Sequence, residues 1–260
     1  MDILSIGGIL LAIVAILGGQ ALEGGHAGSL MQLTAFIIVI GGTIGAVMVA
    51  FPKADFIRGL KLGKSVFKEE KIDINGLVVQ LVEMAAIARR DGVLALEGKL
   101  ASISDPFLKR AVGFVVDGVD AAVARSALEG QIEAEAEENT MGAKVFESAG
   151  GFAPTVGILG AVLGLIHVME NLSNPDAIGP GIAVAFVATV YGVGVANLIA
   201  LPMAGKLTTR SREEVIEKGM IIEGIMSISA GDNPRIMERK LHSYLAPALR
   251  ESAIRRMRSE

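Results

Sequence analysis

The side chains of this sequence that could do chemistry are hydroxyls and prolines embedded in long apolar runs. They are Thr34, Thr43, Pro154, Thr155, Thr189, Tyr191 and Pro202. In a membrane, such hydroxyls either line a polar path for an ion or satisfy carbonyls of their own helix, and a proline frees one carbonyl in the preceding turn. The residue types alone leave both interpretations open.

The same apolar runs carry no Asp, Glu, Lys or Arg near their centres. Because proton pathways in membranes normally use such groups, a partner should bring the carboxylate if an ion moves here. The sequence also lacks a Gly-x-Ser-x-Gly nucleophile, a Gly-x-x-x-x-Gly-Lys phosphate loop, a dinucleotide fingerprint, metal-ligand spacing and cysteine. We expect no catalytic residue, no metal, no cofactor and no enzyme activity.

Membrane helices must position these side chains. Of the 260 residues, 52% are hydrophobic and 4% aromatic, and the mean hydropathy is +0.55. Uncharged runs long enough, at about 1.5 Å per residue, to cross a core of about 30 Å predict spans at 3–22, 30–51, within 148–169, and from about 181 to 203. In the second span, Gly41 and Gly45 form a small-residue pair that would let another helix approach closely.

The distribution of cations predicts the topology. All 24 Lys and Arg residues lie in 53–144 and 206–258, and none lies in 1–52 or 149–203. Since Lys and Arg are enriched on the cytoplasmic side, both blocks and both termini should be cytoplasmic. Acidic residues accompany each block, so we expect neither polybasic lipid binding nor nucleic-acid binding.

The insert and the tail both show helical patterns. We predict one helix over the apolar positions 78–87, closed by Arg89-Arg90-Asp91-Gly92, a second over 93–103, a third from Asp105 onward, and a fourth from near 120 that continues into the third span. The tail should break at 231–234. The predicted fold class is an all-α membrane protein with four transmembrane helices, a helical cytoplasmic insert between helices two and three, and a helical C-terminal tail. The predicted domains are 1–52, 53–147, 148–203 and 204–260.

Four stretches then resemble one family. The run 153–165, Ala-Pro-Thr-Val-Gly-Ile-Leu-Gly-Ala-Val-Leu-Gly-Leu, is similar to the third membrane helix of the flagellar motor stator A subunit, the MotA/PomA family of the MotA/TolQ/ExbB superfamily. Residues 185–192, 88–97 and 105–109 match it too, and the likeness spans essentially the whole chain. A TolQ/ExbB-like energiser is one alternative, which the fourth span and the long insert disfavour. A scaffold without ion flux is another.

This resemblance implies an assembly in the bacterial inner membrane. A homo-oligomeric ring, a pentamer in contact with membrane lipid, would surround two copies of a stator B subunit. That subunit has one span, an ion-carrying aspartate and a peptidoglycan-binding domain. Ion binding at the aspartate would change contacts along spans three and four, and the ring would turn and push the rotor.

The resemblance also assigns roles to residues. The family's prolines at Pro154 and Pro202 couple to the conformational cycle, and its threonine at Thr189 lines the ion path. As hydroxyls in the same apolar runs, Thr155 and Tyr191 are predicted to belong to that path as well. Family residues matching Arg89 and Glu97 engage the rotor switch protein FliG, and Arg90 shares that role.

Ion choice follows from two positions. Sodium needs several oxygen ligands, whereas a proton needs a titratable carboxylate and a wet path. Sodium-driven relatives resemble one another in a threonine seven residues after the third-span proline, where this chain has Ala161, and often in another before Thr189, where it has Ala188. The sequence therefore predicts proton coupling, with a sodium-driven stator as the alternative.

Overall fold

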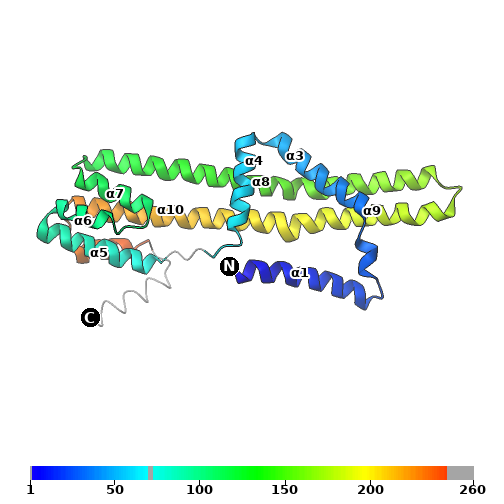
Figure 1. The fold of residues 1–260 in the computed structure, drawn as a ribbon, viewed down its shortest axis with the longest axis horizontal. Coiled ribbons are helices and arrows are strands. Elements are labelled where there is room, and N and C mark those ends of the chain that lie inside the picture. Colours follow the sequence, from blue (N-terminus) through cyan, green and yellow to red (C-terminus); the bar gives the residue numbers. More distant parts are fainter. Residues whose placement is uncertain (1, 70–72, 245–260) are drawn as a thin grey trace. The chain divides into compact units, whose positions relative to one another are not determined.

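The computed structural model describes residues 2–69 and 73–244, and within them it contains helices and no strand (Figure 1). The all-α fold class is confirmed for this part of the chain, while the tail predicted over 245–260 lies outside it. The elements in chain order are α1 (Ile3–Leu22), η1 (Ala27–Leu30), α2 (Leu33–Phe36), η2 (Ile37–Gly41), α3 (Gly42–Ala50), α4 (Lys53–Ser65), α5 (Ile74–Asp91), η3 (Val93–Leu96), α6 (Glu97–Leu100), α7 (Pro106–Val116), α8 (Ala121–Glu170), α9 (Pro175–Val195), η4 (Ala196–Ala200), α10 (Leu201–Ser229) and α11 (Pro234–His242).

Four of the described helices are long and apolar enough to cross a membrane: Ile3–Leu22, Leu33–Ala50, Ala121–Glu170 and Ile178–Ser229. This confirms the predicted number of spans. The third lies in the last part of α8, a 50-residue helix that begins where the sequence predicted. The Asp120 carboxylate caps its start by accepting hydrogen bonds from the amides of Ala122 (2.9 Å) and Val123 (3.2 Å).

The second span is not a uniform α-helix. Its middle, η2, is a π-helical turn, and the segment predicted to start it at 30 is instead the end of the 3-10 turn η1. A Cβ built at Gly41 or Gly45 would have no neighbour within 4 Å, whereas one at Gly42 would lie 2.8 Å from Val156. The close approach predicted at Gly41 and Gly45 is therefore not made within this chain. The extra residue of the π turn shifts the inward face by one position.

The fourth span starts earlier than predicted and does not end at 203. Pro175 takes the first helical position after the extended Asn174, so only 171–174 form the turn. The helix then passes through the π turn η4 into α10, which ends at Ser229. Because the ring of Pro202 would meet the carbonyl of Leu198 in a regular helix, the π turn at Ala196–Ala200 lets the helix continue past this proline.

The insert differs from the prediction in three places: α4 (Lys53–Ser65) lies where no helix was predicted, α5 begins at Ile74 rather than at 78, and 93–103 is not one helix. Helix α5 ends at Asp91, and Gly92 has φ +84°, which glycine adopts without strain. The single helix predicted next is replaced by the 3-10 turn η3 and the short α6, because the chain bends to bury Leu96 completely. Helix α7 starts as predicted, with the Asp105 carboxylate accepting from the Leu108 amide at 2.6 Å.

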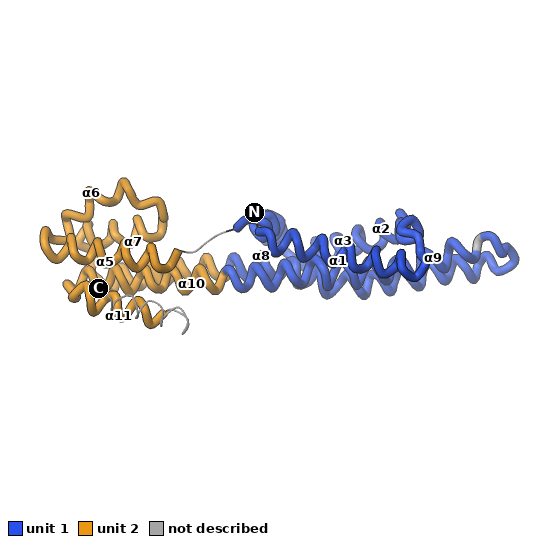
Figure 2. Tube along the Cα trace, turned by 90° about the horizontal axis from the view of Figure 1, so that it is seen from below, with its two compact units in different colours: residues 1–69, 138–210 blue, residues 70–137, 211–260 orange. Residues whose placement is uncertain are grey.

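The chain forms two compact units (Figure 2). The first comprises 1–69 and 138–210, with small clusters such as Ala35, Val39, Val187 and Ala188. The second comprises 70–137 and 211–260 and has a larger core that includes Leu81, Leu96, Leu108, Leu128, Met220, Ile225 and Leu241. Many large aliphatic side chains of the first unit are exposed, so lipid or other subunits must cover them.

Candidate functional site

A glycine seam joins the third and fourth spans. A Cβ built at Gly192 would lie 2.5 Å from the carbonyl oxygen of Ala153 and 3.2 Å from the Cα of Pro154. One at Gly157 would lie 2.9 Å from the oxygen of Ala188, and one at Gly164 would lie 2.8 Å from that of Gly181. The two backbones therefore touch along several turns, in the manner that small residues permit in membrane helices.

Pro154 lies in this seam, half-buried and inside the continuous helix α8. Having no N–H, it cannot donate to the carbonyl of Gly150. The Thr155 hydroxyl donates to the carbonyl of Phe152 at 2.8 Å, so it does not replace the missing bond. The Thr155 side chain otherwise faces outward.

Thr189 and Tyr191 lie two residues apart but contact different parts of the first unit. The Thr189 hydroxyl donates to the Ala185 carbonyl at 3.2 Å, and its side chain lines a groove of about 400 Å³ whose opposite wall includes Ile16 of α1. The Tyr191 hydroxyl donates to the Leu30 carbonyl at 2.5 Å and accepts from the Gln32 amide at 3.4 Å. Tyr191 thus fastens the segment before the second span, and its ring packs edge-on against Phe36 at 6.3 Å between centroids.

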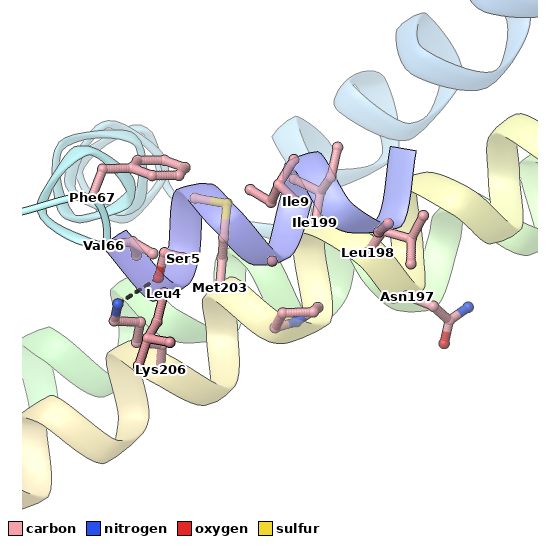
Figure 3. Close-up of a pocket in the computed structure, with 13 residues that line it drawn as sticks. Leu4, Ser5, Ile9, Val66, Phe67, Asn197, Leu198, Ile199, Met203 and Lys206 are labelled. Atoms are coloured by element: carbon pink, nitrogen blue, oxygen red, sulfur yellow. Dashed lines mark hydrogen bonds between the residues drawn. The ribbon is translucent and has the colours of Figure 1, made fainter. Parts of the chain in front are cut away.

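Pro202 lines a second groove, of about 300 Å³, between α1, the end of α4 and the η4–α10 junction (Figure 3). Asn197 and Leu198 line both grooves. The Asn197 amide nitrogen donates to the Val193 carbonyl at 3.0 Å, and within the described residues its oxygen accepts no hydrogen bond. Sequence reasoning missed Asn197, although an amide inside an apolar run was a visible signal.

A charged cluster closes the polar end of this second groove. Lys206 forms an ion pair with Asp2 and donates to the Ser5 hydroxyl at 2.5 Å, the contact drawn in Figure 3. The Asp2 amide donates to the Phe67 carbonyl at 3.0 Å. Arg210 donates to the carbonyls of Ser65 and Lys68. The cluster ties the starts of α1 and α10 to the end of α4, and the sequence did not predict it.

The two positions that bear on ion choice differ in their surroundings. Ala188 is fully buried in the seam, where its Cβ lies 2.8 Å from a Cβ built at Gly160. Ala161 is half-buried on the third span. The structure therefore does not gather the predicted path residues in one cavity: Thr189 and Pro202 lie on neighbouring grooves, Pro154 lies in the seam, and Tyr191 faces the second span.

The residues predicted to meet the rotor lie in the second unit, around the end of α5 and the start of α6. Arg90 donates from Nε to Asp91 Oδ1 at 2.9 Å and from a terminal nitrogen to Oδ2 at 2.7 Å. This hydrogen bonding raises the pKa of Arg90 and lowers the pKa of Asp91. Arg89 and Glu97 are exposed, and neither forms an ion pair with any residue that the structure describes.

The fold and the site together define a class of protein. It is a multi-pass helical membrane protein whose spans, in their described apolar lengths, present hydroxyl and amide groups but no Asp, Glu, Lys or Arg. Across 2–69 and 73–244, no three potential metal ligands among His, Cys, Asp and Glu come together.

Comparison with known proteins identifies the family. The model of the MotA/TolQ/ExbB proton channel family matches residues 99–220, and that of the motility protein A N-terminal region matches 6–92. Motility protein A of Bacillus subtilis (strain 168) is 39% identical over 246 residues, which cover 94% of this chain and 91% of that protein.

Two solved structures are also similar over nearly the whole chain. The C. jejuni MotAB structure has a TM-score of 0.90 and 36% identity, and the flagellar MotAB stator complex from Bacillus subtilis has a TM-score of 0.88 and 38% identity. Each comparison covers 95% of this chain and 97% of the other. The chain therefore belongs to the MotA/TolQ/ExbB proton channel family, among its MotA/PomA stator A subunits, and the resemblance read from the sequence is confirmed.

Proposed function

We propose that this chain, as the A subunit of a flagellar motor stator, conducts protons together with a B subunit and converts the ion-motive force into torque. One observation carries the conducting role. Helix four presents Thr189 and Asn197 along a groove, yet the described apolar lengths of the spans hold no carboxylate that could carry the ion. A partner must supply that carboxylate, and both similar solved structures are MotAB complexes.

The glycine seam supports a particular place for the path. Because the backbones of spans three and four touch, an ion cannot pass between them within one chain. The path should instead follow an outer face of this pair. Thr155 is exposed on α8 near Ile158 (58% exposed), and Phe186 (71%) and Val190 (45%) are exposed on α9. A B-subunit helix could pack on such a face.

The first span supports a ring assembly. None of the 20 residues of α1 is buried within the chain. A helix that is apolar all round and unburied must be covered by lipid or by other subunits. We propose a pentamer around two B subunits in the inner membrane, with both termini cytoplasmic and with 1–52, 53–147, 148–203 and 204–260 as its functional domains.

Coupling to protons can be tested directly. Ala161 offers no oxygen to a sodium ion, and Ala188 is sealed in the seam. Rotation driven by this chain and its B subunit should therefore persist when sodium is replaced by potassium and should stop with a protonophore. Tethered-cell rotation speed would report both effects. Rotation that stops on sodium removal but survives the protonophore would establish the sodium-driven alternative.

Arg89 is proposed as the main rotor contact, because Arg90 is already engaged by Asp91. Arg89→Glu should lower swimming speed about tenfold, as expected when one attractive charge pair becomes repulsive. Arg90→Glu should have a smaller effect. Arg235→Glu, an exposed α11 residue with the same charge change, is the control. A compensating reversal on FliG should restore part of the Arg89→Glu loss, and equal swimming by all three variants would refute the assignment.

A further inference from the structure

Helix α4 (Lys53–Ser65) has an outer face that the stator mechanism does not use. It begins just after the second span ends at Ala50, with Pro52 extended between them. Figure 1 shows α4 running across the direction of α8 rather than along it. A helix that turns aside at the end of a span lies at the level of the lipid headgroups, as amphipathic interfacial helices do.

The inner face of α4 is held by packing against α8. A Cβ built at Gly59 would lie 2.8 Å from Val145, and one at Gly63 would lie 2.5 Å from Phe146. Arg58 pairs with Glu138 at 3.0 Å. Since Arg210 also donates to the Ser65 carbonyl at the end of α4, the helix cannot roll, and the direction of its outer face is fixed.

The outer face combines cations with aliphatic side chains. Lys53, Lys61 and Lys64 are exposed, and none forms an ion pair within the described residues. Between them lie Ile57 (40% exposed) and Leu60 (51% exposed). The acid within α4, Asp55, points toward Arg58 at 3.8 Å and does not neutralise the lysines.

We infer that this outer face of α4 binds anionic phospholipid headgroups of the adjacent leaflet. Aliphatic side chains at the boundary enter the acyl region, while lysines extend their stems along it and place ammonium groups at the phosphates. Charge complementarity selects an anionic lipid over a zwitterionic one. From the sequence we expected no polybasic lipid binding, because acidic residues balance the cations over the whole insert. In the fold, those acidic residues lie away from the outer face of α4.

The chain contains no tryptophan, which permits a site-specific test. Leu60→Trp places an indole on the outer face, and brominated lipids quench an indole that they contact. The complete stator complex would be reconstituted in phosphatidylcholine bilayers containing phosphatidylglycerol, with bromine on one lipid or the other. The signal of the complex without Leu60→Trp would be subtracted.

We expect quenching at position 60 to show about a fivefold preference for phosphatidylglycerol, a size typical of one lysine near an anionic lipid. K53Q/K61Q/K64Q should bring the preference to about one. K53R/K61R/K64R should keep it, as should K99Q/K109Q/R239Q, which removes three exposed cations of the second unit. A Val14→Trp reporter on α1 should show no preference.

Three results would overturn the inference: equal quenching by the two lipids at position 60, a preference that survives K53Q/K61Q/K64Q, or no quenching by either lipid. The last would mean that another subunit or protein covers α4. K53R/K61R/K64R changes the same three positions but keeps their charges. If the glutamine variant lost its lipid preference through misfolding, we expect the arginine variant to lose it too. The quenching test needs only that the spans cross a bilayer. Its result is therefore independent of the proposed proton conduction and torque.

Discussion

Gly192→Val is expected to abolish stator function, because its branched side chain would enter the seam where two backbones touch. The Cβ alone would lie 2.5 Å from the Ala153 oxygen and 3.1 Å from the Cα of Gly157, and backbone atoms cannot swing aside as a flexible side chain can. Overpacking of this kind costs about 1–3 kcal/mol. Proton flux through the reconstituted complex should fall at least about tenfold, and the thermal unfolding temperature should drop.

The matched control is Gly205→Val, on the same continuous helix. A Cβ there has no heavy atom within 4 Å, so its valine adds the same bulk without entering the seam. We expect flux and unfolding temperature near those of the unmodified complex. If Gly192→Val were as stable and as active as Gly205→Val, the seam would not be the contact that holds spans three and four together.

Pro154→Ala should separate stability from function. Alanine restores an N–H that can donate to the Gly150 carbonyl inside α8, and an interior helical proline is unfavourable by about 3 kcal/mol relative to alanine. The variant should therefore unfold at a higher temperature. Because Pro154 is proposed to let α8 bend during the ion cycle, proton flux should nevertheless fall about tenfold. This corresponds to about 1.4 kcal/mol added to the free energy of the bending step.

Pro180→Ala provides the comparison, since Pro180 also lies inside a membrane helix but near the start of α9. Its replacement should raise the unfolding temperature without lowering flux. Differential scanning calorimetry of the purified complex measures the unfolding temperature. Proton flux into proteoliposomes made from the same preparation measures the activity. Unchanged flux in Pro154→Ala would remove this proline from the coupling role, whatever its stability.

Local patterns were enough to predict several elements. The first span is observed at its predicted bounds, Ile3–Leu22, because the charges of Asp2 and Glu23 delimit it. Helix α7 begins after Asp105 because an aspartate cap followed by proline acts within one turn. The residues 93–103 could not be predicted in the same way. Their local sequence favours a single helix, but burying Leu96 in the core of the second unit requires the chain to bend there.

In the candidate site, too, local sequence patterns predicted some features and tertiary packing decided the others. Its residue types were visible in the sequence, and so were Pro154 and Thr189 as unusual residues in apolar runs. Their neighbours were not visible. Tyr191 looked like a further hydroxyl on the path, yet it holds Leu30 and Phe36, and Asn197 was overlooked although it lies on the same groove as Thr189.

By itself, the sequence was enough to identify a four-span helical membrane protein of the stator A family, and it predicted that a partner brings the ion-carrying carboxylate. Hydropathy and charge act residue by residue, so they can be read along the chain. Only the tertiary structure decided which side chains meet. The link from Lys206 to Ser5 joins residues 201 positions apart, and one π turn decided that Gly42, rather than Gly41, faces the third span. Such contacts depend on helix rotation and packing, which no local pattern specifies.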